Sequence, residues 1–166
     1  MSQVNSIIRR ISFARRYTLG LLDSVDDADW SRMPGGCPTN IAWQAGHLAM
    51  AEYRLCLERV RGPRPEDAAL ISPEFIARFH RDSTPREADE GRPSPAEIRA
   101  VMARVHEAAL SLLDQIDDPL LAEPIHTPHA FCSTKAEIYD WCSAHEMLHA
   151  GQIGLLRRAL GAAPRW

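Results

Sequence analysis

Residues 94–116 read SPAEIRAVMARVHEAALSLLDQI, and this stretch shows most clearly which fold class the chain adopts. Ser94 and Glu97 have the spacing of a helix capping box, and Pro95 stands at the first helical position, where no N–H is needed. The apolar residues that follow recur at steps of three and four, the period of an amphipathic helix. They are Ile98, Val101, Met102, Val105, Ala109, Leu112, Leu113 and Ile116. The pattern predicts one helix with a single buried face, closed by Asp117-Asp118-Pro119.

Three further segments show the same period and carry helix end signals. They cover about residues 4–25, 39–60 and 134–160. Thr39 or Asn40 supplies the N-cap of the second, and Thr134 with Glu137 forms a capping box at the start of the last. Gly161 provides its C-terminal stop. Four long amphipathic helices predict an all-α four-helix bundle, formed by one domain over residues 1–166.

The connections between these helices differ in length and composition. Residues 61–93, between the second and third helices, are rich in proline, arginine and acidic residues, with a short helix expected around Pro73 to His80. A connection this long in a compact domain is usually functional. Residues 119–133 contain Pro124 and Pro128 and are expected to be extended or irregular. Strand-like alternation and internal repeats are absent from the sequence.

Composition narrows the class of protein. The chain has 166 residues, a net charge of −3, 45% hydrophobic and 25% charged residues, as expected for a globular domain. We expect no nucleic-acid partner, because no basic face is evident. We expect no membrane partner either, because no run approaches the ~18 apolar residues of a membrane helix. A cytoplasmic location is the expectation. The four cysteines lack metal-binding spacing and are interpreted as small buried hydrophobes.

The sequence HEMLH at residues 145–149 is the strongest chemical signal. His145 and His149, four residues apart on a helix, lie one above the other on the same face. They share a stripe with apolar residues, so both are predicted to point toward the bundle axis. A single inward histidine is usually satisfied by a hydrogen bond. Two stacked on one apolar stripe are better explained by a shared metal ion, because unpaired buried polar groups cost about 1–3 kcal/mol each.

A third ligand must come from upstream, and His47 is the best candidate. It lies midway along the second predicted helix, beside Gly46, which would let a neighbouring group approach closely. Taken alone, His47 would more often be a core residue than a ligand. The remaining histidines are interpreted as surface or rim residues. They are His80, His106, His126 and His129.

HExxH is also the signature of zinc peptidases, with the glutamate as general base. Here no histidine, aspartate or glutamate follows His149, so the usual downstream ligands are missing. The sequence leaves the role of Glu146 undecided between a catalytic general base, a group that orients a histidine, and a solvated or interhelical residue. Gln152, one turn past His149, is a candidate for binding a ligand or cofactor. Gly151 and Gly154 are expected to allow close packing or to leave space for substrate.

Two segments resemble the metal motifs of one family. Residues 40–49, NIAWQAGHLA, with Glu52 following, resemble the first metal motif of the DinB/YfiT-like superfamily, and residues 145–153, HEMLHAGQI, resemble its second. The order of the elements is similar over the whole chain. The resemblance implies a four-helix bundle, often a homodimer, with a nickel- or zinc-type ion on His47, His145 and His149. This family is distinct from the DNA polymerase that shares the DinB name.

Family members with known activity include thiol-dependent isomerases and S-transferases that use mycothiol, bacillithiol or glutathione. The resemblance implies a metal-dependent thiol S-transferase that acts on a small molecule, with a low-molecular-weight thiol as a candidate cosubstrate. Three imidazoles leave a coordination position open, which is typical of catalytic rather than structural sites. A water bound there would be activated as a nucleophile, so the same site also predicts a hydrolase. The alternatives are a non-catalytic module that binds a metal or small ligand, and the HExxH metallopeptidase.

Overall fold

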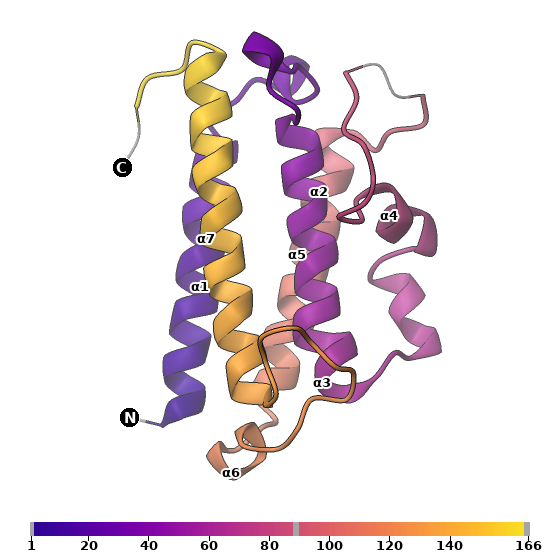
Figure 1. The fold of residues 1–166 in the computed structure, drawn as a ribbon, viewed down its shortest axis with the longest axis vertical. Helices are drawn as coiled ribbons and strands as arrows, with labels where there is room; N and C mark the ends of the chain where they lie inside the picture. Colours follow the sequence, from indigo (N-terminus) through magenta and orange to yellow (C-terminus); the bar gives the residue numbers. More distant parts are fainter. Residues whose placement is uncertain (1, 88–89, 165–166) are drawn as a thin grey trace.

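The computed structural model describes residues 2–87 and 90–164, and its long helices form a bundle (Figure 1). The longest are α1 (Gln3–Leu22), α2 (Ile41–Glu52), α5 (Pro95–Leu113) and α7 (Lys135–Ala159). An isolated bridge between Pro124 and Thr134 is the sole β-pairing in the described part of the chain. The predicted all-α class is confirmed. Within the described ranges, no helix combines the length and apolar character needed to cross a bilayer.

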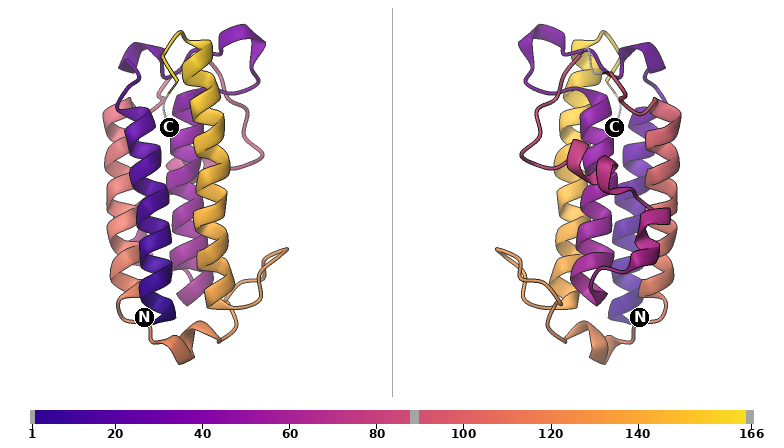
Figure 2. Two further views of the ribbon diagram at one scale, coloured as in Figure 1. Left: turned by 90° about the vertical axis from the view of Figure 1, so that its left-hand side faces the viewer. Right: turned by 90° about the vertical axis from the view of Figure 1, so that its right-hand side faces the viewer.

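Helices α2 and α7 are neighbours in the bundle. α1 packs along α7, and α2 packs against both α5 and α7. As Figure 2 shows, α1 and α7 run in one direction, and α2 and α5 run in the other. The long connection after α2 must therefore return along the bundle before α5 begins. It includes η4 (Pro65–Ala69) and α4 (Pro73–Arg78), close to the short helix predicted there.

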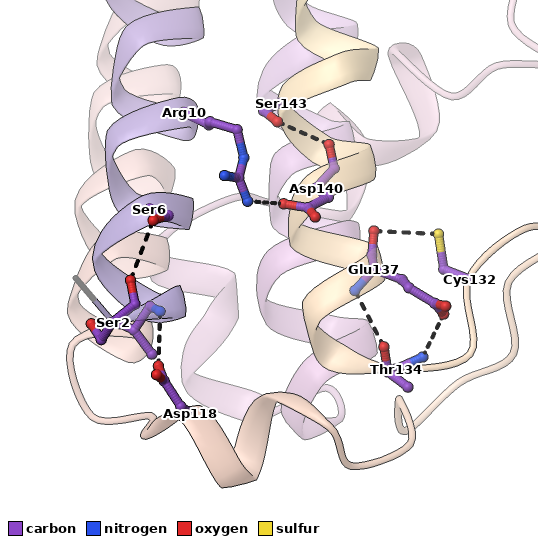
Figure 3. Close-up of polar contacts among 10 residues, drawn as sticks. Ser2, Ser6, Arg10, Asp118, Cys132, Thr134, Glu137, Asp140 and Ser143 are labelled. Atoms are coloured by element: carbon purple, nitrogen blue, oxygen red, sulfur yellow. Dashed lines mark hydrogen bonds and ion pairs between the residues drawn. The ribbon is translucent and has the colours of Figure 1, made fainter.

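The predicted helix caps are present. Ser94 and Glu97 form a reciprocal capping box at α5, and Thr134 and Glu137 form another at α7, drawn in Figure 3. At α2 the cap is Asn40, whose side-chain oxygen accepts a hydrogen bond from the N–H of Trp43 at 2.8 Å. These local contacts satisfy backbone donors that a helix start leaves unpaired, so the sequence signals located the helix starts well.

The segment between α5 and α7 begins differently from the prediction. Residues 119–133 were expected to be extended or irregular, but Asp118–Leu121 forms a single helical turn, α6. The side chain of Asp117 caps this turn, and Pro119 lies within its first two positions, where proline is well tolerated. Asp118 also accepts hydrogen bonds from the N–H groups of Gln3 and Val4, both at 3.0 Å, and so closes the start of α1. Figure 3 shows Asp118 beside the first turn of that helix.

The second predicted helix has its expected length but is not regular. After α2, residues Tyr53–Glu58 form a π-helix, η3, and Arg59–Arg61 complete the last turn as α3. The N–H of Arg59 bonds to the carbonyl of Arg54, five residues earlier. A π-turn takes up one residue more than an α-turn and often marks a functional site. Gly62, with φ of 83°, ends the segment.

The buried face of α7 is wider than the predicted stripe. It includes Cys142 of that stripe and also Glu146 and Ala150, whereas His145 and His149 are half-buried at its edge. Both histidines turn toward His47 of α2, so they lie between two helices rather than on the bundle axis. A Cβ added at Gly151 or Gly154 would meet no atom within 4 Å, so neither glycine is required for close helix packing. Of the four cysteines, Cys37 is half-buried and the other three are buried.

Candidate metal centre

His47, His145 and His149 meet between α2 and α7. One nitrogen from each ring lies within 4.8 Å of the others. The Nε2 atoms of His145 and His149 are 3.2 Å apart. His47 comes from the antiparallel neighbour helix, and its ring centroid is 4.7 Å from that of His149. The pair on one helix and the single histidine on the other thus form one cluster, which we call the histidine cluster.

His47 is held by two contacts. Its Nδ1 lies 2.9 Å from the carbonyl oxygen of Phe79, and Trp43 stacks on its ring at a centroid distance of 4.7 Å. Phe79 reaches this position because Gly46 has no side chain: an added Cβ would lie 2.4 Å from the Phe79 ring. Nδ1–H donates to the carbonyl, so the proton sits on Nδ1 and the lone pair of Nε2 remains available to a ligand.

His149 is oriented by a second glutamine that the sequence reasoning missed. The side-chain Nε2 of Gln44 donates to Thr39 Oγ1 at 2.9 Å and to Gln152 Oε1 at 2.8 Å. These two contacts turn the amide oxygen of Gln44 toward Nδ1 of His149, with which it forms a hydrogen bond. Nδ1 of His149 is therefore the protonated nitrogen, and Nε2 again carries the free lone pair.

Burial keeps the cluster uncharged at neutral pH. It lowers the pKa of His145 to about 4 and that of His149 to about 3, and neighbouring histidines add to both shifts. Burial also lowers the pKa of His47, partly opposed by the hydrogen bond to Phe79. Neutral imidazole is the form that binds a metal ion.

The spacing of the two donors on α7 fits one shared ion. Two nitrogen ligands of one Zn²⁺, each about 2.1 Å from the ion and roughly 90–110° apart, lie about 3.0–3.4 Å from one another. The 3.2 Å between Nε2 of His145 and Nε2 of His149 falls in this range. Two lone pairs at that distance repel one another unless a proton or a cation lies between them. The donor set therefore fits a divalent metal ion.

Glu146 belongs to a different buried cluster. Its carboxylate pairs with Nε of Arg15 at 2.9 Å, and Nη2 of Arg15 pairs with Glu52 at 2.7 Å. Nδ1 of His106 lies 2.7 Å from the other oxygen of Glu52. We call these four residues the ion-pair cluster. Burial raises the pKa of Glu146, and Arg15 opposes that shift. The position of Glu146 matches the interhelical role, and its role as general base stays a prediction without support from these contacts.

A cavity of about 510 Å³ opens beside the histidine cluster. His47 and His145 line its inner end, and Trp141 lines one wall. The loop before α7 covers part of it, because the N–H of His126 bonds to the carbonyl of Arg59 at 2.6 Å. A larger groove of about 740 Å³ lies between α1 and α7, but it contains none of the clustered histidines. The cavity at the histidines is thus the one that gives a small molecule access to them.

The other candidate residues take distinct places. His80 and His129 line the cavity, in agreement with a rim position, whereas His106 enters the ion-pair cluster. Gln152 contacts Gln44 and so acts on His149 through that residue, while its predicted role in binding a ligand stays a prediction. Gln44 could have been noticed from its position three residues before His47, on the same helix, but no local pattern shows that it faces Gln152.

A comparison with protein families agrees with this arrangement. The profile of the DinB superfamily matches residues 10–153, a span that contains all three clustered histidines. A search of curated proteins returns no relative of the chain.

Proposed function

Because this chain belongs to the DinB superfamily, we propose that it is a metal-dependent enzyme acting on a small molecule, as a thiol S-transferase or a hydrolase. The observation that carries the proposal is the convergence of three neutral imidazoles, two of which, His47 and His145, line an open cavity. His47, His145 and His149 would hold the ion. Imidazole ligands suit zinc and nickel alike, so either ion is compatible with the site.

The residues that contact the histidines and the cavity wall would support this chemistry in different ways. When bound, the ion would polarise a substrate or lower the pKa of a bound thiol or water. Phe79 and Gln44 hold the ring protons of His47 and His149 on Nδ1, so that both Nε2 atoms stay directed at one point. Trp141 and Phe131, whose rings lie 5.2 Å apart, shield one side of the cavity from water.

Two other functions receive less support. A non-catalytic metal-binding module would share the histidine cluster, but it has no need of a cavity at the open side of the ligands. The peptidase requires Glu146 to reach a substrate, and the side chain of Glu146 is 3% exposed and paired with Arg15. Nothing bears on the homodimer or the cytoplasmic location, and both stay predictions.

The proposed activity is tested with protein loaded with zinc or nickel. Thiol transfer is measured as loss of free glutathione, bacillithiol or mycothiol in the presence of an electrophile, and hydrolysis is measured with chromogenic esters. We expect metal-dependent turnover in one assay, lost in His149→Ala and retained in His126→Ala, since His126 lies outside the cluster. Stoichiometric metal without turnover in any assay would favour the binding module, and absence of metal would refute both.

A further inference from the structure

The cavity beside the histidine cluster is lined by positive charge. Arg54, Arg59 and Arg81 contribute to its wall, and among the described residues no aspartate or glutamate does. Arg81 is 81% exposed and has Asp82 beside it, so its charge is largely screened by solvent. Of the three arginines that line the cavity, Arg54 and Arg59 are the two that are half-buried.

The π-helix brings Arg59 to the side of the helix on which Arg54 already lies. Arg54 is seven residues after His47 and therefore shares its face on a helix with about 100° per residue. Arg59 is twelve residues after His47, which on an uninterrupted α-helix would place it about 120° away. One additional residue taken up by the π-turn returns Arg59 to within about 20° of that face. The irregular turn thus aligns Arg59 with the histidine cluster.

The two arginines differ in the number of hydrogen bonds that their side chains make. Nη1 of Arg59 donates to the carbonyl oxygens of Thr127 and Pro128 and so holds the loop that covers the cavity. Arg54 has one long ion pair, 3.5 Å from its Nε to Glu58, and its side chain is 36% exposed. Within the described residues, the buried Nε of Arg54 has no hydrogen-bond partner, and its side chain makes no other hydrogen bond. Its planar fork is therefore available to a ligand.

The rest of the wall is apolar or aromatic. Trp141 packs edge-on against Phe131, which is 72% exposed at the mouth of the cavity. Met50 and Leu55 line the helix side between His47 and the arginines. An apolar wall with few convergent polar groups is typical of sites for small organic ligands.

We propose that this cavity selects a small organic oxyanion, a molecule with a carboxylate or phosphate on an apolar or aromatic body, and that Arg54 is the residue that binds the anionic group. The inference rests on the proposed function only in naming this molecule as the substrate or cosubstrate. The binding itself depends on Arg54 and the apolar wall, and so it can be measured without the metal. Arg59 supports the site by holding the covering loop.

The test compares three probes on metal-free protein: 3-phenylpropionate, phenyl phosphate and the uncharged 3-phenylpropionamide. Binding is measured by ligand-observed NMR titration. We expect at least one anion to bind about tenfold more tightly than the amide, because a charged hydrogen bond contributes about 1.5–3 kcal/mol. Whichever anion binds better identifies the preferred group. Equal affinity for the amide and both anions, or no detectable binding of either anion, would overturn the proposal.

The variants assign the preference to one side chain. Arg54→Met should abolish the preference for the anion, and Arg54→Lys should retain part of it, since the charge stays but the planar fork is lost. The matched control, Arg104→Met, alters an exposed arginine on α5 outside the cavity lining and should leave the preference unchanged. A preference that survives Arg54→Met in a folded variant contradicts the assignment. Metal content, measured separately on the same variants, reports on the proposed function and should not change.

Discussion

Two polar clusters lie inside the same bundle and draw on the same two helices, yet their chemistry is opposite. The ion-pair cluster sets Arg15 between the carboxylates of Glu52 and Glu146, and His106 adds a fourth group. Its charges compensate one another and are almost fully buried. The histidine cluster holds three uncharged rings whose lone pairs converge beside a cavity. The first cluster joins opposite charges to one another, and the second directs uncharged donors toward a shared point.

The residues of the HExxH motif belong to both clusters. His145 and His149 belong to the histidine cluster, whereas Glu146, between them in the sequence, turns about 100° around the helix into the ion-pair cluster. A buried ion pair contributes little net stability, but removal of one partner is costly. We therefore expect substitutions in the ion-pair cluster to alter stability, and substitutions in the histidine cluster to alter metal binding.

The largest effect is expected for Arg15→Met. It leaves two carboxylates buried side by side without their cation, so the free energy of unfolding should fall by about 3–5 kcal/mol. Chemical denaturation measures this change. Arg16→Met, at an exposed neighbouring position on α1, should change stability by less than about 0.5 kcal/mol. Equal stabilities of the two variants would show that the ion-pair cluster does not hold the bundle together.

Glu146→Gln separates the two clusters more directly. The amide keeps the shape of the side chain but loses the charge that pairs with Arg15, and we expect a loss of about 1–3 kcal/mol in unfolding free energy. The metal content should remain that of the unaltered protein. Loss of bound metal in a folded Glu146→Gln variant would mean that the two clusters are not independent.

The histidine positions could be predicted from spacing and family pattern, but their surroundings could not. The helix starts followed from local capping signals such as Ser94 with Glu97, which depend on residues close in sequence. The width of the α7 face was misjudged because Glu146 was not expected to be the most buried of the polar residues on that helix. Its partner Arg15 is far away in sequence, and a charge is placed in a core only when such a partner is present.

The π-helix was unpredicted for a similar reason. Residues 53–58 continue the apolar period of α2 well enough to look regular, and the additional residue becomes evident only from the backbone hydrogen bonds. Gly46 was interpreted correctly as a place of close approach, although the approaching group, Phe79, lies in the long connection, whose path the sequence does not specify.

Gln44→Leu tests whether the histidine cluster is preorganised. Without the amide oxygen, Nδ1 of His149 loses its acceptor, and metal affinity should fall about 10–100-fold. Competition with a chromogenic chelator measures this affinity. Gln115→Ala, an exposed glutamine near the end of α5, serves as the control and should bind metal as the unaltered protein does. An unchanged affinity for Gln44→Leu would remove its assigned role in orienting His149.

The smallest effects are expected at two helical glycines. In Gly46→Ala the added methyl group displaces Phe79, which should lower the unfolding free energy by about 1–3 kcal/mol. A gain of about 1 kcal/mol in helix propensity offsets part of this loss. Gly151→Ala meets nothing within 4 Å and should stabilise the protein by up to about 1 kcal/mol. Thermal unfolding compares the two, and destabilisation by Gly151→Ala would reveal a packing constraint absent from this structure.

Elemental analysis of the purified protein tests the central claim most directly. The unaltered chain should contain one equivalent of a divalent metal ion, and His47→Ala and His149→Ala should each lose it while remaining folded. His106→Ala, which alters the histidine of the ion-pair cluster, should retain the metal at a reduced stability. A full equivalent of metal in folded His149→Ala, or none in the unaltered chain after incubation with zinc and with nickel, would contradict the assignment of the three histidines as the metal site.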